Sequence, residues 1–170
     1  MAYGITLWGG ASEVKDILLV QKKAIRILCG TEFLTHCKPL FVSEKILTVF
    51  NFYIYRSAIK AFHSVCTLPT RGDVHDHGTR GRLRLDLPYC RLGRTQSSLI
   101  YQPAEILNKL PVSARTLPET VLKRRLRAFP QENPFYSMRE FYDCDPQTVC
   151  YNDTSSWPGF IAYQKSLSSA

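Results

Sequence analysis

Two long stretches with the periodicity of helices constrain the fold of this chain more than any other feature. The first, residues 13–29, repeats apolar side chains at the spacing of one helix face, at Val14, Ile17, Leu18, Ile25 and Leu28. Gly30 follows directly, and glycine readily takes the left-handed backbone conformation that ends a helix. We therefore expect an amphipathic helix over this stretch, ended at Gly30.

The second stretch, residues 43–65, is the most hydrophobic part of the chain and is too long for one strand. It predicts a largely buried helix of about six turns that begins near Ser43 and ends before Pro69. Because residues 30–42 are a short connection, the two helices should pack antiparallel, with one short turn of helix between them.

Short segments before and after these helices read as strands and loops. Residues 3–8 are rich in aromatic and β-branched side chains, which predicts a strand or a buried extended entry. Residues 67–78 have the composition of a loop. Arginines then alternate with glycine or leucine over residues 80–85, the period of a strand, and residues 97–101 form its expected partner. We expect a small β-hairpin here.

Two short helices are predicted after the hairpin. One begins at Pro103 and is ended by Pro111, and the other begins at Pro118. In the second helix the spacing places these apolar side chains inward: Val121, Leu122, Leu126 and Phe129.

The end of the chain contains one more helix signal and then loses all periodicity. Residues 137–140 match a capping box, so a last helix should cover residues 138–143. Residues 144–170 show no period, and we expect a disordered tail. The sequence thus predicts a mainly α fold, with a helical region at 1–66, a basic region with the hairpin and short helices at 67–143, and the tail.

Positive charge is concentrated in the middle of the chain, which carries a net charge of +8 overall. Residues 71–127 hold twelve Lys or Arg against five acids, compared with eight against four in residues 1–70 and two against five in residues 128–170. A basic block of this kind is expected of a protein that binds a polyanion, and solubility alone is the alternative.

Several basic side chains are candidates for contact with a nucleic-acid backbone, because a guanidinium fork fits phosphate oxygens and because like charges on one face repel unless anions match them. Solvated helix faces and protection of a strand edge are the structural alternatives. The candidates are Lys15, Lys22, Lys23, Arg26, Arg80, Arg82, Arg84, Arg91, Arg94, Lys123, Arg124, Arg125 and Arg127, with Tyr89 and Tyr101 as candidate stacking faces for bases.

Cysteine and histidine spacing indicates neither a disulfide framework nor a metal site. The six cysteines include no Cys-x-x-Cys, and the N-terminus lacks a signal-peptide pattern, so we expect reduced thiols. The close pair His75 and His77 has no suitably spaced thiols and is interpreted as two loop residues. No apolar run approaches the roughly 20 residues of a membrane-spanning helix, so we expect a soluble, intracellular protein.

Four short patterns occur in a fixed order along the chain. They are Tyr3-Gly4-Ile5 with Leu7-Trp8-Gly9, Gln21-Lys22-Lys23-Ala24-Ile25-Arg26, His75-Asp76-His77-Gly78-Thr79-Arg80, and Asn108-Lys109-Leu110-Pro111. Ile46-Leu47-Thr48-Val49 and Tyr53-Ile54 lie between the second and the third. In this order, over residues 3–142, they resemble the thumb and the C-terminal tail of reverse transcriptases from arthropod-type, jockey-like non-LTR retrotransposons.

The resemblance implies a thumb-like helical bundle that holds template and primer, or the element's own RNA, beside a palm domain. In that family the palm lies upstream and carries the aspartates that hold two metal ions. This chain has no Asp-Asp pair, and Tyr142-Asp143-Cys144-Asp145 follows a helical segment rather than lying in a hairpin. We therefore expect a C-terminal fragment of an RNA-directed DNA polymerase, cytoplasmic or nuclear. Alone it would be no enzyme and would need no cofactor, whereas the parent polymerase would use Mg²⁺.

Two other interpretations belong to different classes. A helical protein-interaction module would use apolar surface from residues 3–8 and 43–65. Exposed aromatic side chains would favour this interpretation, and so would binding that depends only weakly on salt concentration. A decayed copy of an element would have no function.

Overall fold

The computed structural model describes residues 3–64, 68–76, 78, 80–87, 89–93, 98, 100–111 and 117–145. Within these ranges the chain forms helices and no strand, so the predicted mainly α fold is confirmed. The predicted tail from Pro146 onward lies outside the described residues, as do Cys66, His77 and Arg94.

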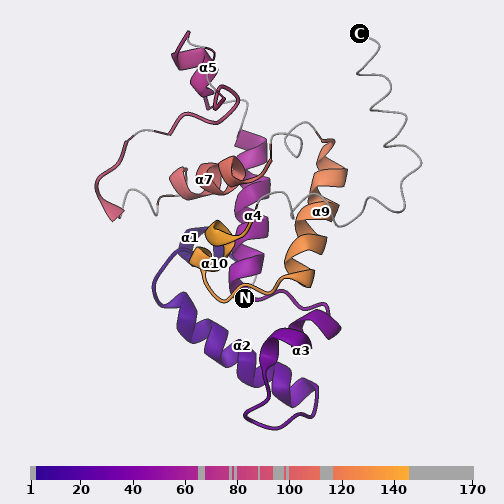
Figure 1. Cartoon of the computed structure of the whole chain (residues 1–170). Helices are drawn as coiled ribbons and strands as arrows, with labels where there is room; N and C mark the ends of the chain where they lie inside the picture. Colours follow the sequence, from indigo (N-terminus) through magenta and orange to yellow (C-terminus); the bar gives the residue numbers. More distant parts are fainter. Residues whose placement is uncertain are drawn as a thin grey trace, which may run out of the picture.

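Helix α4 (Val49–Ser64) is the central element of the fold (Figure 1). Helices α7 (Tyr101–Lys109) and α9 (Glu119–Glu132) pack against it along its length, and α1 (Ile5–Trp8) packs near its start. Helix α10 (Met138–Asp143) completes this group, because its Phe141 side chain is buried in the same core. The chain therefore folds around the segment that the sequence marks as most hydrophobic.

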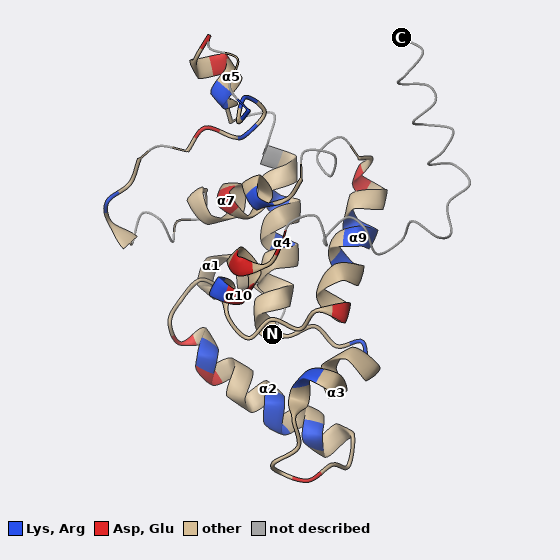
Figure 2. Ribbon diagram, in the orientation of Figure 1, with Lys and Arg blue, Asp and Glu red and all other residues tan. Residues whose placement is uncertain are grey.

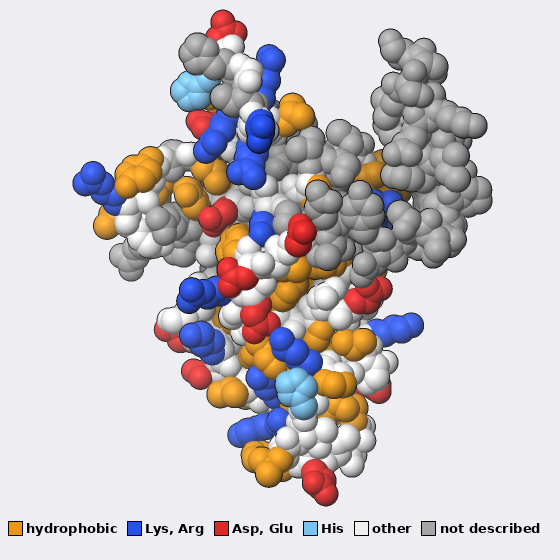
Figure 3. All heavy atoms as spheres, in the orientation of Figure 1, with side chains coloured by type: hydrophobic (Ala, Val, Ile, Leu, Met, Phe, Trp, Pro, Cys, Tyr) orange, Lys and Arg blue, Asp and Glu red, His pale blue; other side chains and the backbone are white. Residues whose placement is uncertain are grey.

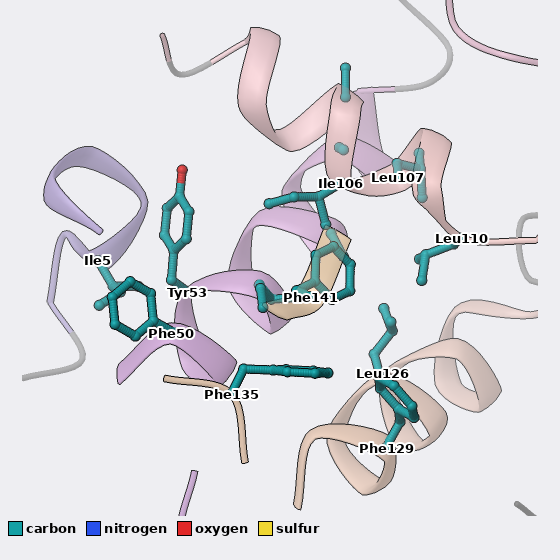
Figure 4. Close-up of a cluster of buried hydrophobic side chains, with 14 of the residues drawn as sticks. Ile5, Phe50, Tyr53, Ile106, Leu107, Leu110, Leu126, Phe129, Phe135 and Phe141 are labelled. Atoms are coloured by element: carbon teal, nitrogen blue, oxygen red, sulfur yellow. The ribbon is translucent and has the colours of Figure 1, made fainter. Parts of the chain in front are cut away.

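Aromatic side chains from the C-terminal part fill the centre of this core (Figure 4). The ring of Phe135 lies 5.8 Å from that of Phe141 and 5.9 Å from that of Phe129, and the first pair is edge to face. Such pairs add stabilisation beyond the burial of their apolar area. The α9–α10 connection is consequently anchored in the core and does not lie loosely on the surface.

A buried polar network joins the start of α4 to the same connection. The Asn51 side-chain amide donates to the carbonyl oxygens of Pro130 at 2.5 Å and Asn133 at 3.0 Å, and its oxygen accepts from the Phe135 backbone amide at 3.0 Å. The Thr48 hydroxyl donates to the Phe135 carbonyl oxygen at 2.7 Å. Because each backbone group would otherwise be buried without a partner, this network fixes the path of residues 130–135.

Helix α2 (Val14–Leu28) pairs with α3 (Cys37–Ser43) beside the start of α4 (Figure 1). The predicted end of α2 is confirmed: Gly30 has a φ of 61°, its amide donates to the Ile27 carbonyl, and the Thr31 amide donates to the Arg26 carbonyl. This pair of bonds is a Schellman motif, which requires the left-handed residue that glycine supplies.

The prediction of one long helix from Ser43 was wrong, whereas the short helix expected in the connection is present as α3. Residues 44–48 interrupt the stretch, Lys45 has a φ of 53°, and α4 begins only at Val49. The Gln21 side chain fixes this break by donating to the Leu47 carbonyl at 2.7 Å and accepting from the Val49 amide at 2.9 Å. A tertiary contact thus overrides the local periodicity, and α2 packs on α3 as well as on α4.

The predictions of strands were also wrong. Residues 3–8 contain the helical turn α1, which follows Gly4 at a φ of 64° and is closed by the Trp8 indole donating to the Tyr3 carbonyl at 3.1 Å. The expected hairpin reduces to one isolated antiparallel bridge between Thr70 and Leu85, with turns over residues 80–83. Tyr101 opens α7 instead of ending a second strand.

The C-terminal helices agree with the sequence. Helix α9 begins directly after Pro118 and buries Leu122, Leu126 and Phe129, as predicted, whereas the fourth predicted core residue, Val121, is half-buried. At α10 the Ser137 hydroxyl accepts from the Glu140 amide at 3.2 Å, which confirms one half of the predicted capping box. The Glu140 carboxylate accepts from the Tyr136 amide and not from that of Ser137, so the other half is not formed.

Candidate nucleic-acid interface

Helix α2 carries the first group of candidate basic residues, two on its exposed side and two beside its buried face. Lys15 and Lys23 are exposed, while Lys22 and Arg26, one helical turn apart, are half-buried beside α3. Within the described residues no carboxylate forms an ion pair with any of the four. Their positive charge is therefore not neutralised within this part of the protein, and it remains available to an anion. Figure 2 shows these basic positions along α2.

Lys22 and Arg26 line a recess of about 220 Å³, which we call the α2 recess, together with Leu34, Thr35, His36, Cys37 and Tyr136. The Lys22 ammonium lies 3.7 Å from the centre of the Tyr136 ring, and the Lys38 ammonium lies 5.0 Å from it. Both distances are within the range of cation–π attraction.

Two backbone contacts hold the walls of this recess. The Arg26 Nε donates to the Thr35 carbonyl oxygen at 2.9 Å, and its two terminal nitrogens have no hydrogen-bond partner among the described residues. The buried Cys37 thiol donates to the Lys22 carbonyl oxygen at 3.7 Å. The guanidinium fork is thus positioned by one nitrogen while the other two remain free to donate.

The Tyr136 hydroxyl is buried and has no hydrogen-bond partner in the described part of the chain. Burial, assisted by the neighbouring Cys37 thiol, raises the pKa of Tyr136 to about 12, and the Arg26 charge opposes this. The hydroxyl therefore stays protonated at neutral pH and can donate a hydrogen bond. Leaving such a donor unpaired costs about 1–3 kcal/mol, so an anion or a water is expected to accept from it.

Helix α3 adds Lys38, whose ammonium forms an ion pair with Glu140 at 3.2 Å. Beside this pair lies a wider groove of about 700 Å³, which Glu132, Glu140 and Asp143 also line. Since carboxylates repel phosphates, this groove is a poor surface for a nucleic-acid backbone. Figure 3 shows basic, histidine and hydrophobic side chains side by side over α2 and α3.

The second basic group is built around α5 (Arg71–Val74) and not on a strand face. The Arg71 amide donates to the Arg84 carbonyl at 2.8 Å, and the Gly72 amide donates to the Arg82 carbonyl at 2.9 Å. The Arg82 stem lies over Gly72, where a side chain would collide with it. Arg80, Arg82 and Arg84 are exposed, so the predicted arginines do lie close together although their predicted strand is absent.

A capping box holds α5 in place. The Thr70 amide and hydroxyl donate to the Asp73 carboxylate at 2.8 and 2.7 Å. These bonds, the hydroxyl first, lower the pKa of Asp73, and the charge of Arg82 adds to the effect. Asp73 therefore remains ionised near the arginines and offsets part of their charge.

The candidates that follow this group differ in exposure. Arg91 is exposed, and Tyr89 has 87% of its surface exposed, so its ring faces are open to a base. Tyr101 is half-buried as the first residue of α7 and offers less of its ring. The predicted contact at Arg94 lies outside the described residues.

The third basic group lies on α9 and is partly neutralised. Lys123 forms an ion pair with Glu119, and His63 lies 3.3 Å from the same carboxylate. The hydrogen bond from Lys123 lowers the pKa of Glu119. Arg124 and Arg127 are exposed, and Arg125 is half-buried.

The structure does not gather the three groups into one patch. In Figure 2 the group on α2 lies at one end of the molecule, the group around α5 lies at the opposite end, and α9 lies between them along one side. One short strand of nucleic acid would therefore contact one group at a time. A longer strand would be needed to bridge them.

Sequence reasoning missed four residues that the structure places beside the candidates: His36, Lys38, Arg71 and Tyr136. Arg71 could have been added from the charge of its own segment. Tyr136 gave no local signal, because it lies about 110 residues after Lys22 and reaches the recess only through the path of the α9–α10 connection.

Other site classes find little support in the described ranges. They hold no group of three His, Cys, Asp or Glu side chains that could bind a metal ion. Cys29, Cys37, Cys90 and Cys144 are free thiols. None of the helices described is both long enough and apolar enough to cross a membrane.

Comparison with models of known protein families, with curated proteins and with solved structures finds no match to this chain. The resemblance to retrotransposon reverse transcriptases therefore depends on the order of the sequence patterns alone.

Proposed function

We propose that this protein binds nucleic acid through the phosphate backbone and that the basic side of α2 is its principal contact. The observation that carries the proposal is that Lys15, Lys22, Lys23 and Arg26 lie on one helix with no ion-paired carboxylate among the described residues. Unpaired cations on a rigid element attract phosphates and release the counterions of the nucleic acid. The groups on α5 and α9 add a weaker, distributed attraction.

The order of the sequence patterns supports a more specific form of the proposal. In this form the chain is the thumb and tail of a non-LTR retrotransposon reverse transcriptase, and α2 lies against template and primer, or against the element's own RNA. The palm domain of that polymerase would be its protein partner and would supply the Mg²⁺-dependent chemistry. This chain would contribute binding and no catalytic residue.

Direct binding measurements test the proposal. The purified chain is titrated into labelled single-stranded RNA, duplex DNA and an RNA–DNA hybrid over a series of salt concentrations. We expect dissociation constants of about 1–100 μM at physiological salt, and much tighter binding at low salt. A sample that circular dichroism shows to be folded and that binds none of the three at low salt would reject the proposal.

Variants locate the contact surface in the same assay. Arg80/Arg82/Arg84→Ala removes the exposed group near α5, and Lys15/Lys23→Ala removes two exposed charges from α2. We expect the α2 variant to lose more affinity for each charge removed, since Asp73 offsets part of the charge near α5.

A protein-interaction module is the second candidate, and one observation favours it. Ile27, Leu28, Phe33 and Leu34, at the α2–α3 end of the molecule, have 80%, 72%, 71% and 89% of their surfaces exposed. Neighbouring apolar side chains of this size are unusual on a monomer. The apolar residues of α4, by contrast, are mostly buried in the core and offer little docking surface.

A further inference from the structure

The α2 recess differs from the exposed basic faces because it is a concave site beside a hydroxyl with no hydrogen-bond partner in the described residues. Its lining, where described, includes Lys22, Arg26 and Tyr136, whose hydroxyl is buried, and it includes no acidic side chain. Glu140 is a neighbouring carboxylate: it accepts from the Tyr136 backbone amide at 3.2 Å, and Lys38 pairs with it at the same distance and offsets its charge. A buried unpaired donor beside two cations is an arrangement that an anion would satisfy.

The size of the recess limits what the anion can be. About 220 Å³ is below the roughly 300 Å³ at which pockets for whole small molecules begin. It exceeds the approximately 30 Å³ that one water occupies in the liquid. The space suits a small oxyanion with a few waters and is too small to enclose a complete nucleotide.

The candidate donors come from two different elements and are of three chemical kinds. Lys22 and Arg26 come from α2, whereas Tyr136 comes from the connection that precedes α10. An ammonium, a guanidinium fork and a hydroxyl from two elements match a tetrahedral anion with several acceptor oxygens better than they match a planar carboxylate.

We propose that the α2 recess binds one phosphate dianion, either free or as the terminal monoester of a nucleic-acid strand. We call these the free form and the strand form of the proposal. The strand form rests on the proposed nucleic-acid binding, whereas the free form does not. In either form the Tyr136 hydroxyl turns toward the recess and donates to a phosphate oxygen, and the Lys22 and Arg26 side chains neutralise the charge.

Tyr136→Phe is the most informative variant. It removes the hydroxyl and keeps the ring that contacts Lys22 and Phe41, so the variant is expected to fold. Tyr55→Phe is the matched control, because it removes a tyrosine hydroxyl from α4 outside the recess. Far-UV circular dichroism and thermal unfolding of both variants establish that they are folded.

The first arm uses inorganic phosphate and follows the backbone amide signals of residues 22–37 and 136 by NMR. We expect saturable shifts in the wild type and in Tyr55→Phe, with a dissociation constant below about 10 mM. In Tyr136→Phe the affinity should fall roughly tenfold, the effect of losing one hydrogen bond to a charged group. Absence of saturable shifts in the wild type, or equal affinity in the two variants, would overturn the free form.

The second arm compares one RNA strand with a 5′-phosphate and the same strand with a 5′-hydroxyl, under equal salt. We expect the phosphorylated strand to bind several-fold more tightly in the wild type and in Tyr55→Phe, and Tyr136→Phe to lose most of that preference. Equal binding of both strands would overturn the strand form and leave backbone binding intact. Failure of both strands to bind would overturn the proposed function together with the strand form, and the inorganic phosphate arm would then decide the free form alone.

Discussion

The ammonium of Lys22 lies 3.7 Å from the centre of the Tyr136 ring, which joins the middle of α2 to the connection before α10. Residues more than 110 positions apart in the sequence thus form one wall of the α2 recess. This contact makes Lys22 both a structural residue and a candidate ligand for phosphate. The two roles can be separated by experiment.

Replacement of Lys22 by Met should lower the free energy of unfolding by about 0.5–1 kcal/mol, because it keeps an apolar stem and removes the cation–π attraction. Urea denaturation followed by tryptophan fluorescence measures the change. Lys23→Met is the control, since the exposed neighbour should change stability by no more than about 0.5 kcal/mol. Equal effects of the two substitutions would show that the ring contact does not stabilise the fold.

Replacement of Asn51 by Leu should be severe, at about 3 kcal/mol or more. The substitution removes the partners of the Pro130 and Asn133 carbonyls and of the Phe135 amide, and it leaves these backbone groups buried or partly buried. Urea denaturation measures the loss. Gln131→Ala removes an exposed hydrogen bond to the Lys45 carbonyl and should cost less than about 1 kcal/mol.

Replacement of Gly9 by Ala should destabilise the protein by about 1–3 kcal/mol through overpacking. The added Cβ would overlap the Tyr53 ring and would lie 2.6 Å from the Ile5 carbonyl oxygen, neither of which can move freely. Thermal unfolding gives the comparison with Gly93→Ala, where nothing lies within 4 Å of the added atom. A Gly9→Ala variant as stable as Gly93→Ala would contradict the close approach of α1 to α4.

Alkaline pH should destabilise the protein through three tyrosines that are buried or half-buried. Burial raises the pKa of Tyr142 and Tyr53, and it raises the pKa of Tyr136 to about 12, from a usual value of 10.0. A group whose pKa is raised on folding contributes stability that is present below its unfolded pKa and is lost as the pH rises through its folded pKa. Stability should therefore be constant up to about pH 10 and fall between pH 10 and about 12.

Circular dichroism against pH measures this loss, and ultraviolet absorbance reports the ionised phenolate. The Tyr142→Phe variant should retain structure to a higher pH than the wild type, because it lacks a group that must ionise on unfolding. An identical alkaline midpoint in the variant would show that Tyr142 does not control the transition.

Helix ends that depend on a nearby glycine, proline or capping side chain could be predicted from the sequence. The end of α2 was correct because Gly30 supplies a left-handed residue, and α9 and α10 were correct because Pro118 and Ser137 begin helices by local geometry. The break before α4 was missed because it depends on the Gln21 side chain, 26 residues before Leu47. The spacing of apolar residues within one helix does not reveal a contact so far away in the sequence.

The candidate site could be predicted only in part for the same reason. Lys22 and Arg26 share a helix face, so their spacing alone brought them together. The alternation of arginines at 80–84 correctly indicated a cluster but gave the wrong element, because the bonds from Arg71 and Gly72 fold the segment into turns. Tyr136 joins the site through tertiary packing, which one sequence does not reveal.

The salt dependence of binding in wild type and in Lys15/Lys23→Ala tests the central claim most directly. Both side chains are exposed, so their removal changes charge and leaves the core intact. On duplex DNA each phosphate contact contributes about 0.9 to the slope of log affinity against log salt concentration, so the variant's slope should be shallower by about 1.8. A folded variant that binds with the wild-type slope and affinity would contradict the claim that α2 contacts the backbone.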